Sequence, residues 1–197
     1  MNPITLDFGP QTRIVARLAE GVRDDRLADP TPCPQYAVRH LLGHLLGLAV
    51  AFRDAGRKDL GATTDTGPQS ALPDIGPGWR EELPKVLDEL AEVWREPAAW
   101  TGMTRAGGFD MPGEVTAAVA VDELVVHGWD LARATGQAYV PDPAALAASH
   151  AFLRAAAEES ERGDGIFGPV VPVPSDAPLL DRTIGLSGRD PGWTRPA

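Results

Sequence analysis

Glu123 and His127 lie four residues apart in a segment that has the composition of a helix. Residues at i and i+4 of a helix share one face, so this carboxylate and this imidazole would point the same way. Carboxylate oxygens and imidazole nitrogens are common ligands of first-row metals, and a catalytic zinc site takes three protein ligands. One histidine from a neighbouring helix would therefore complete such a site.

His44 is the candidate for that third ligand. It is flanked by leucines on both sides, and an imidazole is expensive to bury unless its nitrogens have partners. Gly43 and Gly47 beside it would allow another helix to approach closely. A cation bound by His44, Glu123 and His127 would satisfy three buried polar groups at once. A buried histidine that is bonded to a carboxylate or a carbonyl explains the same residues without a metal, and both interpretations stay open on the residues alone.

The other chemistry-bearing residues each have two interpretations. His40 is four residues before His44 and could be a fourth ligand, although its place near a helix start favours exposure. His150 lies in an alanine-rich segment and is expected to be structural or on the surface. Cys33 is either a reactive thiol or a small buried hydrophobe.

Two further residues could support the site. Asp130 follows His127 by nearly one helical turn and would either orient that histidine or cap a surface. Arg105, in a glycine-rich stretch, is a candidate for binding an anionic thiol, and the alternative is a solvated loop arginine.

The spacing of apolar residues predicts the helices that must position these groups. The segments between them are rich in Pro and Gly, which break helices. No strand alternation is evident except over 169–174, where the prolines favour an extended segment. We expect loops at 57–76 and 96–112 and a short apolar turn over 179–186. The predicted fold is an all-α bundle with long loops, with helices over 11–28, 38–56, 78–94, 113–135 (or from 112) and 143–159.

Composition limits the class of protein. A chain of 197 residues can bury a substantial core as one domain. Its net charge of −10 argues against nucleic acid and anionic membranes as partners, because both need clustered Lys and Arg. We see no apolar run that would span a bilayer and no signal peptide, and the single cysteine excludes an internal disulfide. The expected location is the cytoplasm.

Three segments resemble a known family. Residues 31–44 (TPCPQYAVRHLLGH) resemble the opening of DinB-like metal-binding proteins of actinobacteria. Residues 122–136 (DELVVHGWDLARATG) resemble the ligand helix of the mycothiol-dependent maleylpyruvate isomerase metal-binding domain family. The tail from Phe167 to Pro191 is similar to one uncharacterised subfamily.

The resemblance implies a fold and a ligand set. It implies a DinB-like four-helix bundle over 1–160, with an additional C-terminal helix and an irregular Pro/Gly-rich extension over 161–197 that packs on the bundle. It also implies a divalent metal, usually zinc with Ni²⁺ or Fe²⁺ as alternatives, held by His44, Glu123 and His127. The isomerase carries a further C-terminal domain that residues 160–197 are too short to supply, so its reaction is not transferred.

Three functions are compatible with this ligand set. The first is a metal-dependent, thiol-linked transferase or isomerase, in which the metal holds a thiol such as mycothiol as thiolate for an electrophilic substrate. The second is a hydrolase that uses zinc-activated water, and the third is a non-catalytic metal-binding or stress protein. The expected partners are a small-molecule thiol and an electrophile, and a homodimer is compatible with the sequence.

Overall fold

The structure is a computed structural model that describes residues 6–67, 72–159 and 168–196. Within these ranges the chain is mostly helical, and it forms eight α-helices, one short 3₁₀ helix and one antiparallel pair of strands. The mostly helical architecture predicted from the sequence is confirmed. The elements in chain order are α1 (Gly9–Glu20), η1 (Asp24–Arg26), α2 (Val38–Arg57), α3 (Ala62–Asp65), α4 (Trp79–Val93), α5 (Pro97–Trp100), β1 (Met103–Ala106), β2 (Phe109–Pro112), α6 (Gly113–Thr135), α7 (Pro143–Glu159) and α8 (Leu179–Leu186).

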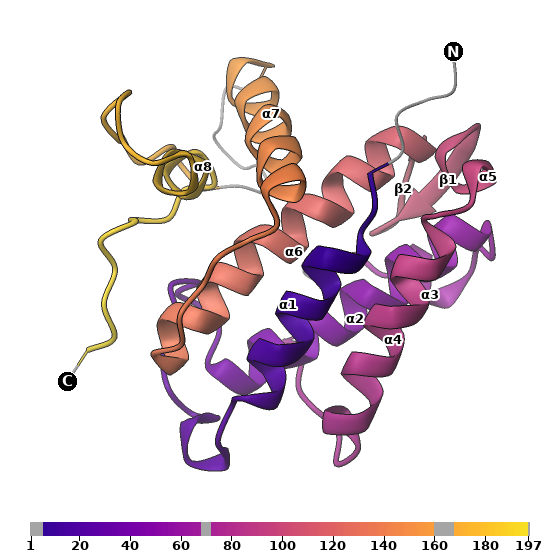
Figure 1. Cartoon of the computed structure of the whole chain (residues 1–197). Coiled ribbons are helices and arrows are strands. Elements are labelled where there is room, and N and C mark those ends of the chain that lie inside the picture. Colours follow the sequence, from indigo (N-terminus) through magenta and orange to yellow (C-terminus); the bar gives the residue numbers. More distant parts are fainter. Residues whose placement is uncertain (1–5, 68–71, 160–167, 197) are drawn as a thin grey trace.

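The hydrophobic core lies where the long helices meet. α2 packs on α4 and α6, and α1 packs on the same two helices. α7 covers α6 on the side away from α2 and α4, and α8 in turn packs on α7 (Figure 1). Fully buried side chains from α2, α4 and α6 fill the space between these helices, among them Leu41, Leu45, Leu87, Leu90 and Val125.

α6 is the central element. It runs for 23 residues, and it is apolar almost all round because helices cover it on opposite sides. Gly136 ends it with φ 74°, a left-handed conformation that glycine adopts without the penalty of a Cβ atom. This confirms the predicted C-terminal end of the helix.

The expectation that the chain is entirely helical is wrong at residues 103–112. Strands β1 and β2 pair antiparallel there, with Ala106 opposite Phe109. The two residues between them, Gly107 and Gly108, have φ 61° and 81°. A two-residue turn of this kind requires positive φ at both positions, so the Gly-Gly pair is a hairpin signal that outweighs the weak alternation of the flanking residues.

Other boundaries also differ from the prediction. α1 ends at Glu20 instead of residue 28, and the side chain of Gln137 occupies the space that a Cβ of residue 21 would need. The predicted loops contain the single-turn helices α3 and α5, and the apolar turn expected over 179–186 is the helix α8. Short helices like these are set by tertiary packing more than by local periodicity.

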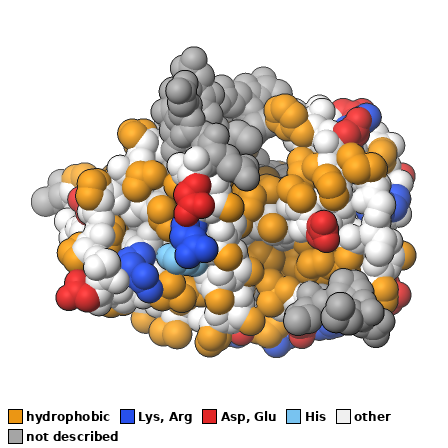
Figure 2. All heavy atoms as spheres, turned by 90° about the horizontal axis from the view of Figure 1, so that it is seen from above, with side chains coloured by type: hydrophobic (Ala, Val, Ile, Leu, Met, Phe, Trp, Pro, Cys, Tyr) orange, Lys and Arg blue, Asp and Glu red, His pale blue; other side chains and the backbone are white. Residues whose placement is uncertain are grey.

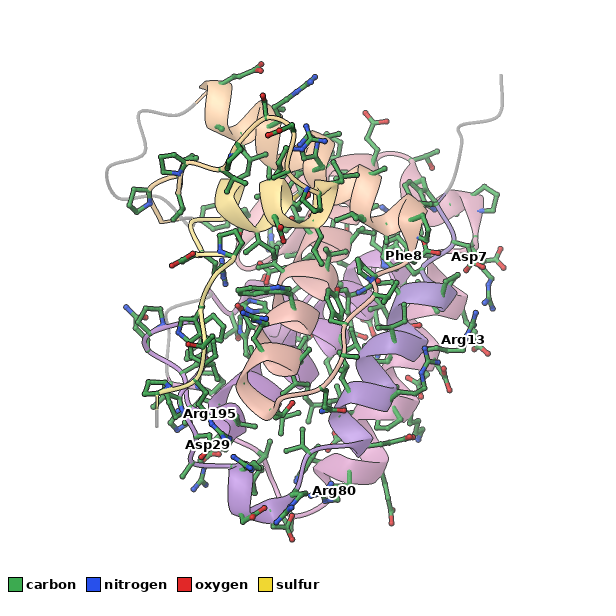
Figure 3. All side chains as sticks on the ribbon, turned by 60° about the vertical axis from the view of Figure 1, so that its left-hand side comes forward. Asp7, Phe8, Arg13, Asp29, Arg80 and Arg195 are labelled. Atoms are coloured by element: carbon green, nitrogen blue, oxygen red, sulfur yellow. The ribbon has the colours of Figure 1, made fainter. Side chains whose placement is uncertain are left out.

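The C-terminal segment lies against the helices without regular structure after α8. Figure 3 shows Arg195 beside Asp29, with 2.7 Å between Nη1 and Oδ2. Arg133 of α6 donates its Nε–H to the carbonyl of Trp193 at 3.0 Å. Among the described residues from 169 to 174 there is no strand, as the prolines led us to expect. The predicted boundary between residues 160 and 161, like Phe167, lies outside the described residues.

Hydrophobic side chains dominate the face of the molecule seen from above, with few charged groups among them (Figure 2). None of the helices within the described ranges is both long and apolar enough to cross a bilayer.

Candidate metal centre

The three predicted ligands come together between α2 and α6. His44 sits in the middle of α2, and Glu123 and His127 occupy successive turns of α6. Oε2 of Glu123 lies 3.0 Å from Nε2 of His127 and 3.6 Å from Nε2 of His44. The two imidazoles meet edge to face with ring centroids 4.7 Å apart. One ligand atom from each residue falls within 4.8 Å of the others.

These distances fit a small divalent cation. Zinc binds nitrogen and carboxylate oxygen at about 2.0–2.2 Å in tetrahedral geometry, which places ligand atoms roughly 3.3 Å apart. The two separations from Oε2 of Glu123, 3.0 and 3.6 Å, lie on either side of that value. Two nitrogens and one carboxylate oxygen are also a donor set that suits zinc and leaves a position open.

Behind His127, a closed polar network fixes the orientation of the ring. Nδ1 of His127 lies 2.9 Å from Oδ2 of Asp130, whose side chain is fully buried. Arg189, from the C-terminal segment, donates Nη2–H to the same carboxylate oxygen at 3.1 Å. Asp130 therefore orients His127 and does not cap a surface, which decides between the two interpretations given above. A histidine whose Nδ1–H is held by a carboxylate presents Nε2 to a metal.

The electrostatics of the cluster follow from these contacts. Burial lowers the pKa of His127, but its hydrogen bonds to the carboxylates of Asp130 and Glu123 outweigh burial and raise the pKa to about 9. Burial alone would raise the pKa of Glu123, yet the bonds from His127 and His44 hold it well below its usual range. Without a metal, Glu123 is thus an anion and His127 a cation, so a metal must displace one proton from Nε2.

His44 behaves differently from His127. Burial lowers its pKa, and the bond to Glu123 only partly offsets that effect. A neutral imidazole is the form that binds metal. His44 is therefore in its ligating form at neutral pH.

Three of the other candidate residues lie elsewhere. His40 accepts a hydrogen bond at Nδ1 from the backbone N–H of Ala37 at 3.2 Å, and it does not belong to the ligand cluster. His150 is half-buried on α7, where burial lowers its pKa. Arg105 forms ion pairs with Asp65 and Asp110 at 3.0 and 2.7 Å, so its guanidinium already has two carboxylate partners.

Cys33 is half-buried and near the cluster. Burial raises the pKa of its thiol, and the charges of Asp130 and Glu123 add to that increase while Arg189 opposes it. A raised pKa keeps the sulfur as an unreactive thiol at neutral pH. Of its two interpretations, the surroundings favour the buried hydrophobe over the reactive nucleophile.

The glycines beside His44 have roles that differ from the expected helix approach. A Cβ at Gly43 would come within 2.7 Å of the backbone of Asp74, so this glycine admits an irregular segment and not a helix. A Cβ at Gly47 would meet no atom within 4 Å. Gly47 instead lines a cavity of about 430 Å³, whose wall also includes His44 and Glu123.

The segment that carries these ligands is similar to a known protein family. Residues 8–132 match the family described as the mycothiol maleylpyruvate isomerase N-terminal domain. The chain belongs to this family. The match spans α1 to most of α6, and it includes all three candidate ligands and Asp130.

Relatives of similar length also exist. An uncharacterised protein of Mycobacterium tuberculosis, found in two strains, is 28% identical over 194 residues, covering 96% of this chain and 98% of that protein.

Two solved structures are similar at lower identity. The crystal structure of the mycothiol-dependent maleylpyruvate isomerase superimposes with a TM-score of 0.49 and 17% identity, over 74% of this chain and 66% of that one. A histidine-to-alanine variant of that isomerase gives the same TM-score at 16% identity. The chain thus spans just under two thirds of the length of the crystallised isomerase.

Two residues of the site were missed by sequence reasoning. Arg189 lies beyond the matched isomerase N-terminal domain, and no spacing rule connects it to Asp130, 59 positions earlier. Tyr36, in the turn before α2, places its ring 5.3 Å from that of His44. Tyr36 stands in the segment that carried the family resemblance, so that motif was the signal that could have found it.

Proposed function

We propose that the protein is a metal-dependent, thiol-linked enzyme, a transferase or an isomerase, in which His44, Glu123 and His127 hold a divalent metal. Zinc is the metal that suits the donor set best, and Ni²⁺ and Fe²⁺ are the alternatives. The thiol is a small molecule of the mycothiol type. Membership of the isomerase N-terminal domain family supports the thiol. The 3.0 and 3.6 Å separations within the cluster support the metal.

Three candidate ligands converge from two helices, while His40, the candidate fourth ligand, does not join them, and this arrangement carries the proposal. His40 is engaged at the start of α2, so three ligands leave a coordination position for an exogenous group. When bound, a divalent metal stabilises a thiolate at neutral pH. Such a position is what a thiol substrate requires.

The surrounding residues have defined parts in this scheme. Asp130 holds the Nδ1–H of His127, and Arg189 balances the charge of Asp130. Glu123 and His44 lie in the wall of the cavity, so an incoming molecule reaches the cluster from that side. The ligand cluster is thereby held in position on the side of Asp130 and remains accessible on the side of the cavity.

We also propose the fold assignment that the resemblance implied. The mutual packing of α1, α2, α4 and α6 supports a DinB-like four-helix bundle over 1–160. The contacts of Arg195 and Arg189 with the helical part support residues 161–197 as an extension packed on it.

Metal analysis followed by thiol titration tests the function. The purified protein is expected to contain about one divalent metal per chain, and mycothiol or a thiol analogue is expected to perturb the absorption of the cobalt-substituted form. Turnover of electrophiles only with thiol present would separate this function from hydrolysis by metal-activated water. Turnover without thiol would contradict the proposal.

A further inference from the structure

The cavity beside the ligand cluster has a definite chemical character. Its volume of about 430 Å³ is within the range of roughly 300–1,000 Å³ that small-molecule pockets occupy. It lies between α2, α3, the β1–β2 hairpin, α6 and α7. Apolar side chains form most of its wall, including Leu48, Phe52, Phe109, Met111, Val119 and Phe152.

Polar side chains contribute little to the wall. Among its described residues, only His44, Glu123, Thr63 and Thr66 have polar side chains. The Thr63 hydroxyl donates to Oδ2 of Asp54 at 2.9 Å, and the Thr66 hydroxyl donates to the carbonyl of Ala62 at 2.7 Å. Both hydroxyl hydrogens are therefore engaged within the protein and are not free to donate to a carboxylate of a ligand.

The described wall also contains no lysine or arginine. Two arginines on elements that line the cavity have carboxylate partners of their own. Arg53 pairs with Asp54 and Glu89, each at 2.8 Å, and Arg105 pairs as described above. A carboxylate that enters such a cavity would lose hydration without gaining a positively charged partner from the described wall, which disfavours its binding.

The ligand cluster does not supply the missing positive charge. If the proposed function holds, a divalent cation there is balanced by one carboxylate, Glu123, and one thiolate. Behind it, Asp130 is balanced by Arg189. No net positive charge remains for an anionic group of a second substrate.

We propose that this cavity binds the electrophilic co-substrate of the enzyme, and that this co-substrate is a neutral, largely apolar molecule instead of a dicarboxylate. The inference rests on the proposed function for the role of the ligand, while the binding preference rests on the wall alone. It sets this chain apart from the relative named for maleylpyruvate, a substrate with two carboxylates.

Gly47 offers a means of filling the cavity. A side chain at this position would project into open space, because no atom lies within 4 Å of the expected Cβ. Gly47→Ala adds one methyl group and removes a glycine from the interior of α2, so it serves as the matched control. Gly47→Leu adds enough volume to obstruct the space near His44. Ala51→Leu, one turn further along the same wall, provides a second obstructing variant.

The test uses zinc-loaded full-length protein and the neutral fluorophore N-phenylnaphthylamine as the probe. We expect saturable binding with a stoichiometry near one, displaced by the neutral enone benzylideneacetone and not by maleate. Gly47→Leu and Ala51→Leu are expected to bind the probe about tenfold more weakly or worse, and Gly47→Ala within about threefold of the unsubstituted protein. Thermal unfolding and metal content identify any variant that has lost its fold.

Displacement of the probe by maleate as effectively as by the enone would overturn the inference. So would unchanged probe affinity in both obstructing variants with intact folds. Failure of the proposed function gives a different result: the neutral probe binds as expected, but thiol leaves the cobalt spectrum unchanged. In that case the cavity remains an apolar binding site and its ligand is not a co-substrate of thiol chemistry.

Discussion

The two flanks of α6 differ in the partners of their buried polar groups. On the flank that faces α2, Glu123 and His127 meet His44 at the wall of a cavity. On the flank that faces α7 and the C-terminal segment, Asp122 accepts a hydrogen bond from Ser149 at 2.6 Å, and Asp130 is paired with Arg189. The first flank is open to a ligand, and the second is closed by the protein itself.

One helix can therefore hold a reactive cluster while its own position stays fixed. Groups that bind a ligand need free lone pairs, whereas the groups that position them need all their hydrogen bonds made within the protein. His127 connects the two flanks because Nε2 faces Glu123 and Nδ1 faces Asp130. Substitutions on the two flanks should therefore have different consequences.

The largest expected effect is on the open flank. His44→Ala removes one of three ligands, so we expect metal affinity to fall about a thousandfold or more, roughly 4 kcal/mol. His40→Ala is the matched control on the same helix, and its metal affinity is expected to stay unchanged. Competition with a chromophoric chelator measures both, and retention of full metal affinity by His44→Ala would contradict the assignment.

On the closed flank, Asp122 predicts a change in folding stability with pH. Burial raises its pKa from 3.8 to about 7. Between these values the folded chain keeps a proton that the unfolded chain has released, so the free energy of unfolding falls as pH rises through this window and levels off above 7.

Asp122→Asn removes that titration. The free energy of unfolding of the unsubstituted protein falls between pH 5 and pH 8, and that of the variant lacks this fall. We therefore expect the stability of the variant relative to the unsubstituted protein to be about 2–3 kcal/mol higher at pH 8 than at pH 5, at about 1.4 kcal/mol per pH unit of the titration. Urea unfolding at the two pH values measures the gain. An equal stability difference at both pH values would show that Asp122 is ionised throughout.

A smaller effect is expected where the closed flank supports the open one. Asp130→Asn keeps the shape of the side chain but weakens its hold on the Nδ1–H of His127, so metal affinity should fall about 10- to 100-fold. Arg189→Met should lower the affinity in the same direction because it leaves Asp130 without its guanidinium partner. Unchanged metal affinity in both variants would show that Asp130 and Arg189 on the closed flank do not influence metal binding on the open flank.

The smallest effect is expected at the far end of the C-terminal segment. Arg195 pairs with Asp29 at 2.7 Å, but its side chain is about a third exposed. Exposed ion pairs contribute about 0–1 kcal/mol. Arg195→Ala should therefore lower the free energy of unfolding by less than about 1 kcal/mol and leave metal affinity unchanged. A loss of metal affinity would show that anchoring of the C-terminal segment at Arg195 also positions Arg189 beside the metal site.

The sequence alone predicts the open flank of α6 better than the closed one. The i, i+4 spacing of Glu123 and His127 and the leucines around His44 led to the three side chains that the structure brings together, because helical periodicity fixes which residues share a face. The helix limits near Gly136 followed from backbone chemistry in the same way. Whether the trio binds a metal stays a prediction.

The parts that depended on tertiary contacts were not predictable. Arg189 reaches Asp130 from an irregular segment, and no local pattern marks such a contact. The β1–β2 hairpin is a different case: its Gly107–Gly108 turn signal is local and present in the sequence, but the weak strand alternation on either side concealed it. The cavity wall is assembled from five elements, so its apolar character appears only when they are packed together.

We expect the open flank of α6 to hold a metal with a coordination position free for a thiol. Thiol titration of the cobalt-substituted protein, followed by visible absorption, tests it most directly. We expect a saturable change at one thiol per metal, including a new sulfur-to-cobalt charge-transfer band, which His44→Ala lacks. A cobalt spectrum that does not change on addition of thiol would show that the metal has no position free for a thiol.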